Sequence, residues 1–167
     1  CILKGNDLKL STTARGNSLE ELAAHCFEKT AGFVITGRNV KHALQVHEID
    51  VMMWNYPHED GFNIFQGPWI VECKHWLDQV GANEVRNFLG KLTYMRAEVG
   101  IIISPCGITG NAAKKNAAFG VVHGAFLGQN VKILTVKTDE LVNISDGKEF
   151  SKLLRDKYIN VSAYGKF

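Results

Sequence analysis

The sequence contains no apolar run that approaches the ~20 residues needed to cross a bilayer, and no signal-peptide pattern at its start. Its four cysteines form no CxxC pair and no Cys/His array with zinc-finger spacing. Two of them, Cys26 and Cys73, fall on faces that we expect to pack into the core. These absences predict a cytoplasmic protein with reduced thiols and without a membrane partner.

Net charge is also small, at +2 for 167 residues, so a nucleic-acid partner is permitted but not demanded. This length fits a single domain with a sizeable core. We expect residues 1–15 to be a lead-in segment and residues 16–167 to form one domain. Because the first residue is Cys1 and not Met, we expect the domain to be part of a longer protein with regulatory or targeting domains.

Two segments that have the pattern of strands, 47–54 and 69–75, carry charged residues where a buried strand should have none. Side chains alternate between the faces of a strand, so Glu48, Asp50 and Met52 share one face. By the same count, Glu72 and Lys74 point the same way. If the segments pair as a hairpin, Asp50 lies beside Glu72.

Two neighbouring carboxylates repel each other and raise one pKa unless a positive charge lies between them. A hard divalent cation, with the Lys74 ammonium nearby, resolves the repulsion between Asp50 and Glu72. The alternative is that these charges lie on the solvated face of an ordinary antiparallel hairpin. Spacing alone does not decide between the two.

The first helix is predicted from an apolar stripe that follows Ser18, with Ser18 and Glu21 forming a capping box at its start. At about 100° per residue, Glu20 borders the stripe and Glu21 points away from it. A carboxylate that faces the protein needs a partner. Glu20 is therefore a candidate site residue, although a local surface salt bridge would also satisfy it.

Asp50 followed by Glu72-Cys73-Lys74 resembles the PD-(D/E)XK nuclease signature, in the variant of Mrr-like restriction endonuclease domains. Ile49 stands in place of the formal proline. The family's first helix carries a G-x-x-L/F-E pattern whose glutamate helps to bind metal, and the segment 16–20 matches it. The resemblance therefore implies that Glu20 contributes to a metal site.

The remaining elements are expected from periodicity and turn residues. Strands are predicted at 32–36, 99–104 and 131–136, a polar connection at 38–45, and helices at 83–97, after 107–110 and from Gly147. With the first helix and the two charged strands, this order matches the αβββαβ core of the restriction-endonuclease fold. We expect an α/β protein with a central mixed sheet flanked by helices.

Several basic or polar side chains are candidates for contact with DNA phosphates. The segment 104–117 resembles the pattern that follows the fourth strand in Mrr-like domains, and there Thr109 would cap a helix whose N-terminus binds phosphate. An ordinary N-cap with two solvated lysines explains the same residues. The candidates are Lys41, Lys91, Thr109, Lys114 and Lys115.

The expected function is a metal-dependent DNA endonuclease, as the effector of a restriction or other anti-phage system. Oxygen ligands suit Mg²⁺ or Mn²⁺, held by Asp50, Glu72, the backbone carbonyl of Cys73, and Glu20. Lys74 would orient or deprotonate the attacking water. A homodimer is compatible with cutting two strands. The alternatives are a non-cleaving nucleic-acid-binding module of the same fold and a hydrolase that uses Cys106 and His123.

Overall fold

The computed structural model describes residues 12–41, 48–75, 77–111, 114 and 116–164. Its elements in chain order are α2 (Thr12–Glu28), β1 (Phe33–Lys41), β2 (Glu48–Asn55), β3 (Gly67–Cys73), α3 (Ala82–Met95), β4 (Val99–Ser104), α4 (Ala117–Gln129), β5 (Lys132–Lys137), α5 (Thr138–Val142), α6 (Gly147–Ile159) and the π-helical turn η1 (Asn160–Tyr164). No helix among these residues is both long and apolar enough to span a bilayer.

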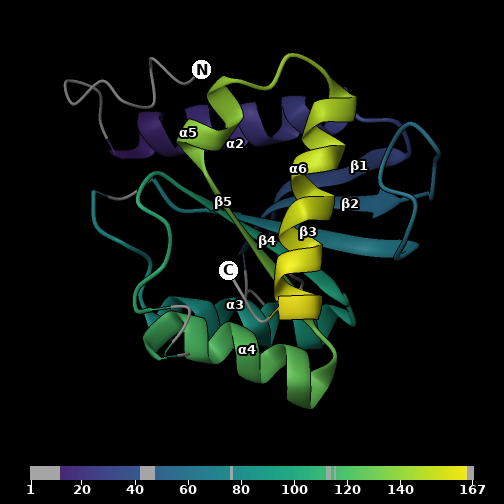
Figure 1. The fold of residues 1–167 in the computed structure, drawn as a ribbon. Helices are drawn as coiled ribbons and strands as arrows, with labels where there is room; N and C mark the ends of the chain where they lie inside the picture. Colours follow the sequence, from purple (N-terminus) through teal and green to yellow (C-terminus); the bar gives the residue numbers. More distant parts are fainter. Residues whose placement is uncertain (1–11, 42–47, 76, 112–113, 115, 165–167) are drawn as a thin grey trace.

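The five strands form one mixed sheet in the order β1-β2-β3-β4-β5 (Figure 1). The first three strands are antiparallel neighbours, whereas β4 runs parallel to both β3 and β5. The parallel connections need crossovers, and α3 and α4 supply them. The predicted α/β fold with a mixed sheet is confirmed.

Helices cover both faces of the sheet. On one face, α2 and α6 pack through Phe27 and Phe150 onto a cluster that includes Trp69 of β3. On the other face, α3 and α4 pack through residues such as Phe88 and Val122. In Figure 1, α3 and α4 lie side by side on the far side of the sheet from α2. The sheet therefore separates two hydrophobic cores.

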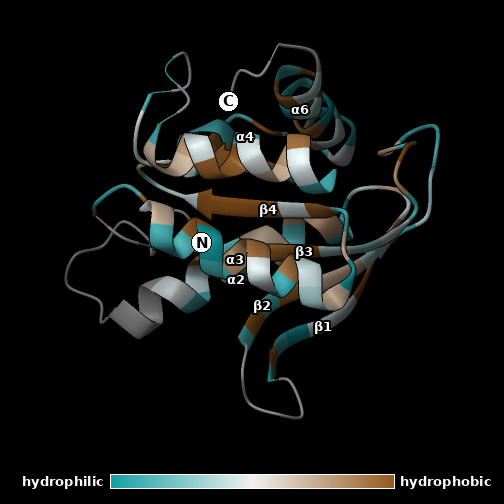
Figure 2. Cartoon of the chain, turned by 90° about the horizontal axis from the view of Figure 1, so that it is seen from below, coloured by the Kyte–Doolittle hydropathy of each residue, from teal (hydrophilic) through white to brown (hydrophobic). Residues whose placement is uncertain are grey.

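The central strand β4 is buried along its whole length, and Figure 2 shows it as hydrophobic over most of its residues. This confirms the strand predicted at 99–104. Gly100 allows α3 to approach it closely, because a Cβ at this position would lie 2.5 Å from Leu92 Cδ1 and 2.7 Å from Phe88 Cε1. This close packing sets the distance between α3 and the sheet, including the neighbouring strand β3.

Two predicted helix starts are wrong. The first helix begins at Thr12, so Ser18 lies inside it and cannot form the predicted capping box. The turn before Ser18 has no apolar stripe, and periodicity detects only the part of a helix that packs. The helix expected after residue 110 begins at Ala117, because its N-cap Asn116 has an extended backbone, with a φ of −110° and a ψ of 171°, that does not continue a helix. Thr109 is therefore not its cap.

The polar connection predicted at 38–45 is wrong for its first residues, since β1 continues to Lys41. Arg38 pairs with Val51 and Lys41 with Glu48. This strand lies at the edge of the sheet, where polar side chains can remain exposed while the backbone pairs with β2.

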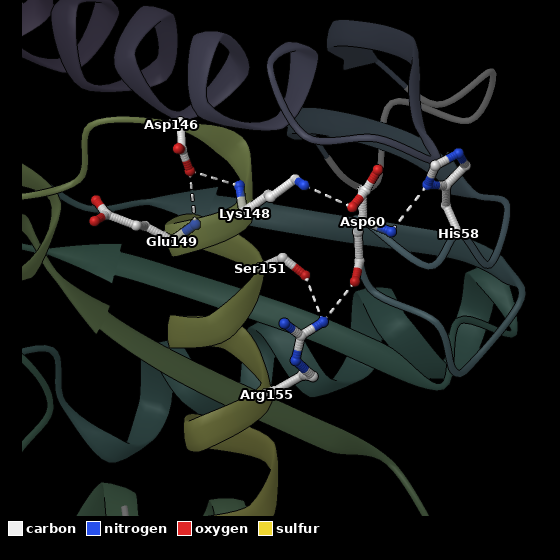
Figure 3. A network of polar contacts seen from close by, with 8 residues as sticks. His58, Asp60, Asp146, Lys148, Glu149, Ser151 and Arg155 are labelled. Carbon is white, nitrogen blue, oxygen red and sulfur yellow. Dashed lines mark hydrogen bonds and ion pairs between the residues drawn. The ribbon is translucent and has the colours of Figure 1, made fainter.

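A polar network fixes α6 to the loop between β2 and β3 (Figure 3). Lys148 Nζ lies 2.8 Å from Asp60 Oδ1, and Arg155 Nη1 donates to Gly61 O at 2.6 Å and to Ser151 Oγ at 3.0 Å. Arg155 is therefore held against the body of the protein and does not extend into solvent. Its guanidinium links the helix to the loop that precedes β3.

Candidate active site

The candidate site begins where the pairing of β2 and β3 ends. Val51 and Val71 form the last pair of this antiparallel ladder, at the carboxyl end of β3. Beyond them, Asp50 Oδ2 accepts a hydrogen bond of 2.6 Å from the backbone N–H of Cys73. A side-chain carboxylate thus takes the place of a backbone carbonyl, which fixes Asp50 at the carboxyl end of β3.

The alternation predicted for β2 agrees with the burial of its side chains. Ile49, Val51 and Met53 are buried, and the positions between them are less buried. The pairing of β2 with β1 keeps one register on both sides of Asp50. Of the three buried side chains, Ile49 belongs to the core cluster beneath α3 and α4, and the other two belong to the opposite cluster.

Glu72 is almost completely buried, with 7% of its side chain exposed, and its two oxygens bind different lysines. Lys74 Nζ lies 2.7 Å from Oε1, and Lys91 Nζ of α3 lies 2.7 Å from Oε2. Lys91 also donates to the backbone oxygen of Glu48 at 2.6 Å. A buried carboxylate requires such partners, and here they come from two separate elements.

Burial and neighbouring charges make Asp50 harder to ionise than an ordinary aspartate. The pKa of Asp50 is raised from 3.8 to about 6 by burial first and then by the negative charges of Glu72 and Glu20, against the hydrogen bond from Cys73 and the charge of Lys74. Glu20 projects from α2 and is half-buried, while Glu21 is exposed. The structure therefore brings the predicted acids Glu20, Asp50 and Glu72 into one electrostatic neighbourhood.

The two other groups at this end of β3 also have perturbed pKa values. Burial opposes the charged form of Lys74, but Glu72 and Asp50 outweigh it, and the pKa of Lys74 is raised. Burial, with the nearby carboxylates, raises the pKa of the Cys73 thiol well above its usual range. That thiol is therefore neutral, and only the Cys73 backbone carbonyl remains as a candidate metal ligand.

The donor set suits a hard divalent cation. Among the described residues, no group of three or more Asp, Glu, His or Cys side chains converges closely enough to hold a metal by itself. However, Mg²⁺ commonly uses one or two carboxylates and retains several waters. Asp50 and Glu72 can provide those carboxylates, and a cation between them would relieve the repulsion that contributes to the raised pKa of Asp50.

The predicted DNA-binding residues are dispersed. Lys41 lies exposed at the end of β1, and Lys114 is exposed with its N–H bound to the side chain of Asn111. Thr109 donates its N–H to the backbone oxygen of Val80. Lys115 lies outside the described residues. The prediction that Lys91 contacts DNA phosphate does not fit its position, because its side chain is 13% exposed and contacts Glu72.

Sequence reasoning missed the contact between Lys91 and Glu72. Phe88 and Leu92 are fully buried positions of α3, and Lys91 is three residues after the first and adjacent to the second. This spacing puts it at the border of the apolar stripe. The position could therefore have been recognised as half-buried, although its partner on β3 could not.

A groove of about 1030 Å³ lies elsewhere, over α3 and the end of α4, with Leu89, Tyr94 and Gln129 in its lining. None of the candidate carboxylates lines it. The candidate site is thus defined by charge and hydrogen bonding at the end of β3, and not by this groove.

The mixed five-stranded sheet with flanking helices is the fold of a restriction-endonuclease-like domain. The family model of Mrr-type catalytic domains, described as restriction endonuclease, matches residues 12–154. The chain therefore belongs to the Mrr catalytic-domain family of restriction endonucleases. This membership implies a DNA-cleaving hydrolase. A comparison with curated proteins found no match.

Proposed function

We propose that this domain is a metal-dependent endonuclease that hydrolyses DNA phosphodiester bonds, as the effector of a restriction or other anti-phage system. The observation that carries the proposal is the arrangement at the end of β3. Asp50 is tied to the Cys73 N–H, and Lys74 lies 2.7 Å from Glu72. Family membership supplies the substrate class.

The proposed cofactor is Mg²⁺ or Mn²⁺, with Asp50, Glu72 and the backbone carbonyl of Cys73 as ligands. Glu20 would complete the shell directly or through water. When bound, the cation supplies a Lewis acid and lowers the pKa of a water. The raised pKa of Asp50 supports this assignment, since part of the rise comes from neighbouring carboxylates that repel it in the absence of a cation.

Side chains of the domain would position the groups that react. Glu72 holds the Lys74 ammonium at the end of β3, where Lys74 can orient the attacking water and stabilise negative charge that develops on the phosphate. Because Asp50 is held by a backbone N–H, its carboxylate has a fixed orientation. Positioning of this kind is the main contribution that a protein makes to phosphoryl chemistry.

DNA phosphates would contact Lys41, Thr109, Lys114 and Lys115. We do not include Lys91 in this set, since its ammonium is bound to Glu72 and Glu48. Two copies of the domain would be needed to cut both strands of a duplex at once. We therefore propose that it acts as a homodimer. We also propose that fused domains bring DNA to it.

Plasmid cleavage in Mg²⁺ or Mn²⁺ tests the function. We expect Asp50→Ala, Glu72→Ala and Lys74→Ala each to lower the cleavage rate by at least ~100-fold, because each removes a group that acts on the reacting atoms. Asp156→Ala is the matched control, since this carboxylate is 53% exposed on α6 and forms an ion pair with Lys152, away from the site.

Undiminished cleavage in all three variants would reject the site assignment. Cleavage by none of the proteins, including the parent, would favour a non-cleaving nucleic-acid-binding module. Calorimetry then separates the two functions, because a pure binding module should have no Mg²⁺ site that depends on Asp50 and Glu72.

A further inference from the structure

Glu72 has two ammonium partners that come from different parts of the chain. Lys74 follows it on the same strand, and Lys91 reaches it from α3; each Nζ lies 2.7 Å from a different carboxylate oxygen. The Lys91 side chain is only 13% exposed and the Glu72 side chain 7% exposed. Little water screens this contact, so it is stronger than a surface ion pair.

Lys91 is unlike the other basic residues of the same helix. Arg86 is exposed and bonds to Asn83 one turn earlier, and Arg96 is exposed at the end of the helix. The stem of Lys91 lies between the buried positions Phe88 and Leu92, and its ammonium is satisfied by Glu72 and the Glu48 oxygen. The helix thus presents one lysine to the site.

We propose that Lys91 is a positioning residue that acts as the resident counter-ion of Glu72 and sets the affinity of the site for its divalent cation. This inference rests on the proposed function and deepens it. In the metal-free protein Lys91 neutralises and orients the buried Glu72 carboxylate. When a cation approaches the same carboxylate, the ammonium repels it and competes for the oxygen lone pairs.

The direction of the effect follows from charge. Replacing Lys91 by a neutral side chain removes one positive charge beside the proposed ligand Glu72, so the cation should bind more tightly. For a unit charge a few Å from a divalent cation, the Coulomb interaction alone at an effective dielectric of about 20 corresponds to more than a thousandfold in affinity. Solvent and the Glu72 side chain rearrange when the ammonium is removed and offset part of this gain, so we take about tenfold as the smallest expected gain. A lysine with only a packing role would give the opposite sign or no change, since its loss would loosen Glu72.

The test is calorimetric titration of Mn²⁺ without DNA. Lys91→Met keeps the aliphatic stem and removes the charge, whereas Lys91→Arg keeps the charge. We expect binding to Lys91→Met to be tighter by at least about tenfold and binding to Lys91→Arg to be near-parental. Arg86→Met is the matched control, because it removes an exposed charge from the same helix and should leave the affinity unchanged.

Each protein is also titrated in an Asp50→Asn background, where the tighter binding should disappear. In a chelator, Lys91→Met should melt below the parent because the buried Glu72 has lost one of its two lysine partners, and Mn²⁺ should reverse most of this loss. If Lys91→Met does not fold, Lys91→Gln retains a donor for the Glu48 oxygen and should shift the affinity in the same direction.

Two outcomes overturn the inference and have different meanings. If the parent binds Mn²⁺ through Asp50 but the neutral Lys91 variants bind it equally or more weakly, Lys91 is not a competing counter-ion and the proposed nuclease function stands. If neither parent nor variants bind Mn²⁺ in an Asp50-dependent way, both proposals are removed. Tighter Asp50-dependent binding supports the inference whether or not the parent cleaves DNA.

Discussion

The metal-free protein should become more stable at pH 8 when Asp50 is replaced by asparagine. The folded state raises the pKa of Asp50 from 3.8 to about 6, chiefly by burial and by the charge of Glu72. Between these pH values the folded protein binds more protons than the unfolded chain. The free energy of unfolding therefore falls as pH rises through this window, and the loss persists at higher pH.

The size of the effect follows from the shift. One pKa unit corresponds to 1.36 kcal/mol, so a change from 3.8 to about 6 costs about 3 kcal/mol of stability at pH 8. The asparagine side chain would remove this cost and still accept the Cys73 N–H, although a neutral amide oxygen is a weaker acceptor than a carboxylate. A net gain of about 1–2 kcal/mol remains, or several degrees in Tm.

Urea unfolding in a chelator at pH 8 and at pH 4.5 measures the gain, which should shrink at the lower pH. Asp50→Ala is the control, because it removes the charge but leaves the Cys73 N–H without its acceptor. It should be about 1–3 kcal/mol less stable than Asp50→Asn. A loss of stability in Asp50→Asn at pH 8, or a gain of equal size at both pH values, would refute the reasoning.

Two further predictions concern α6. Gly147→Ala should destabilise the fold by about 1–3 kcal/mol, because a Cβ there would collide with the backbone oxygen of Lys29. Urea unfolding measures this loss. An unchanged unfolding midpoint would show that the two helix ends move apart freely. Arg155→Met should cost about 1–3 kcal/mol, since it leaves the Gly61 oxygen without this donor. The control is Lys152→Met, at a side chain that is 73% exposed, which should change stability by less than about 0.5 kcal/mol. An equal loss of stability in Arg155→Met and Lys152→Met would contradict the role of Arg155.

The order of elements could be predicted because each packed segment carries its own pattern. The apolar stretch 99–104 requires a strand buried on both faces, and β4 has this burial. Helix starts were harder to predict, because the first turns of α2 carry no apolar stripe and the start of α4 is set by the extended backbone of Asn116. Packing patterns do not report such residues.

The residues of the candidate site could also be predicted only in part. Asp50, Glu72 and Lys74 lie on or beside adjacent strands, so a simple strand count places them in one neighbourhood. The position of Lys91 depends on how closely α3 approaches the sheet, which Gly100 on a third element controls. The orientation of the Asp50 carboxylate depends on a hydrogen bond from the backbone of another strand. Both are tertiary effects that no local pattern encodes.

The two lysines that bind Glu72 also reduce the electric field that the site produces in the surrounding solvent. Above pH 6, the carboxylates of Glu20, Asp50 and Glu72 are opposed by the ammonium groups of Lys74 and Lys91. Three negative charges and two positive charges nearly cancel, so little field extends from the site into solution. A DNA polyanion is then neither drawn to these candidate groups nor strongly repelled by them. The encounter rate and its salt dependence should be set by basic surfaces outside the site, and variants of the site itself should alter cleavage far more than the rate at which DNA arrives.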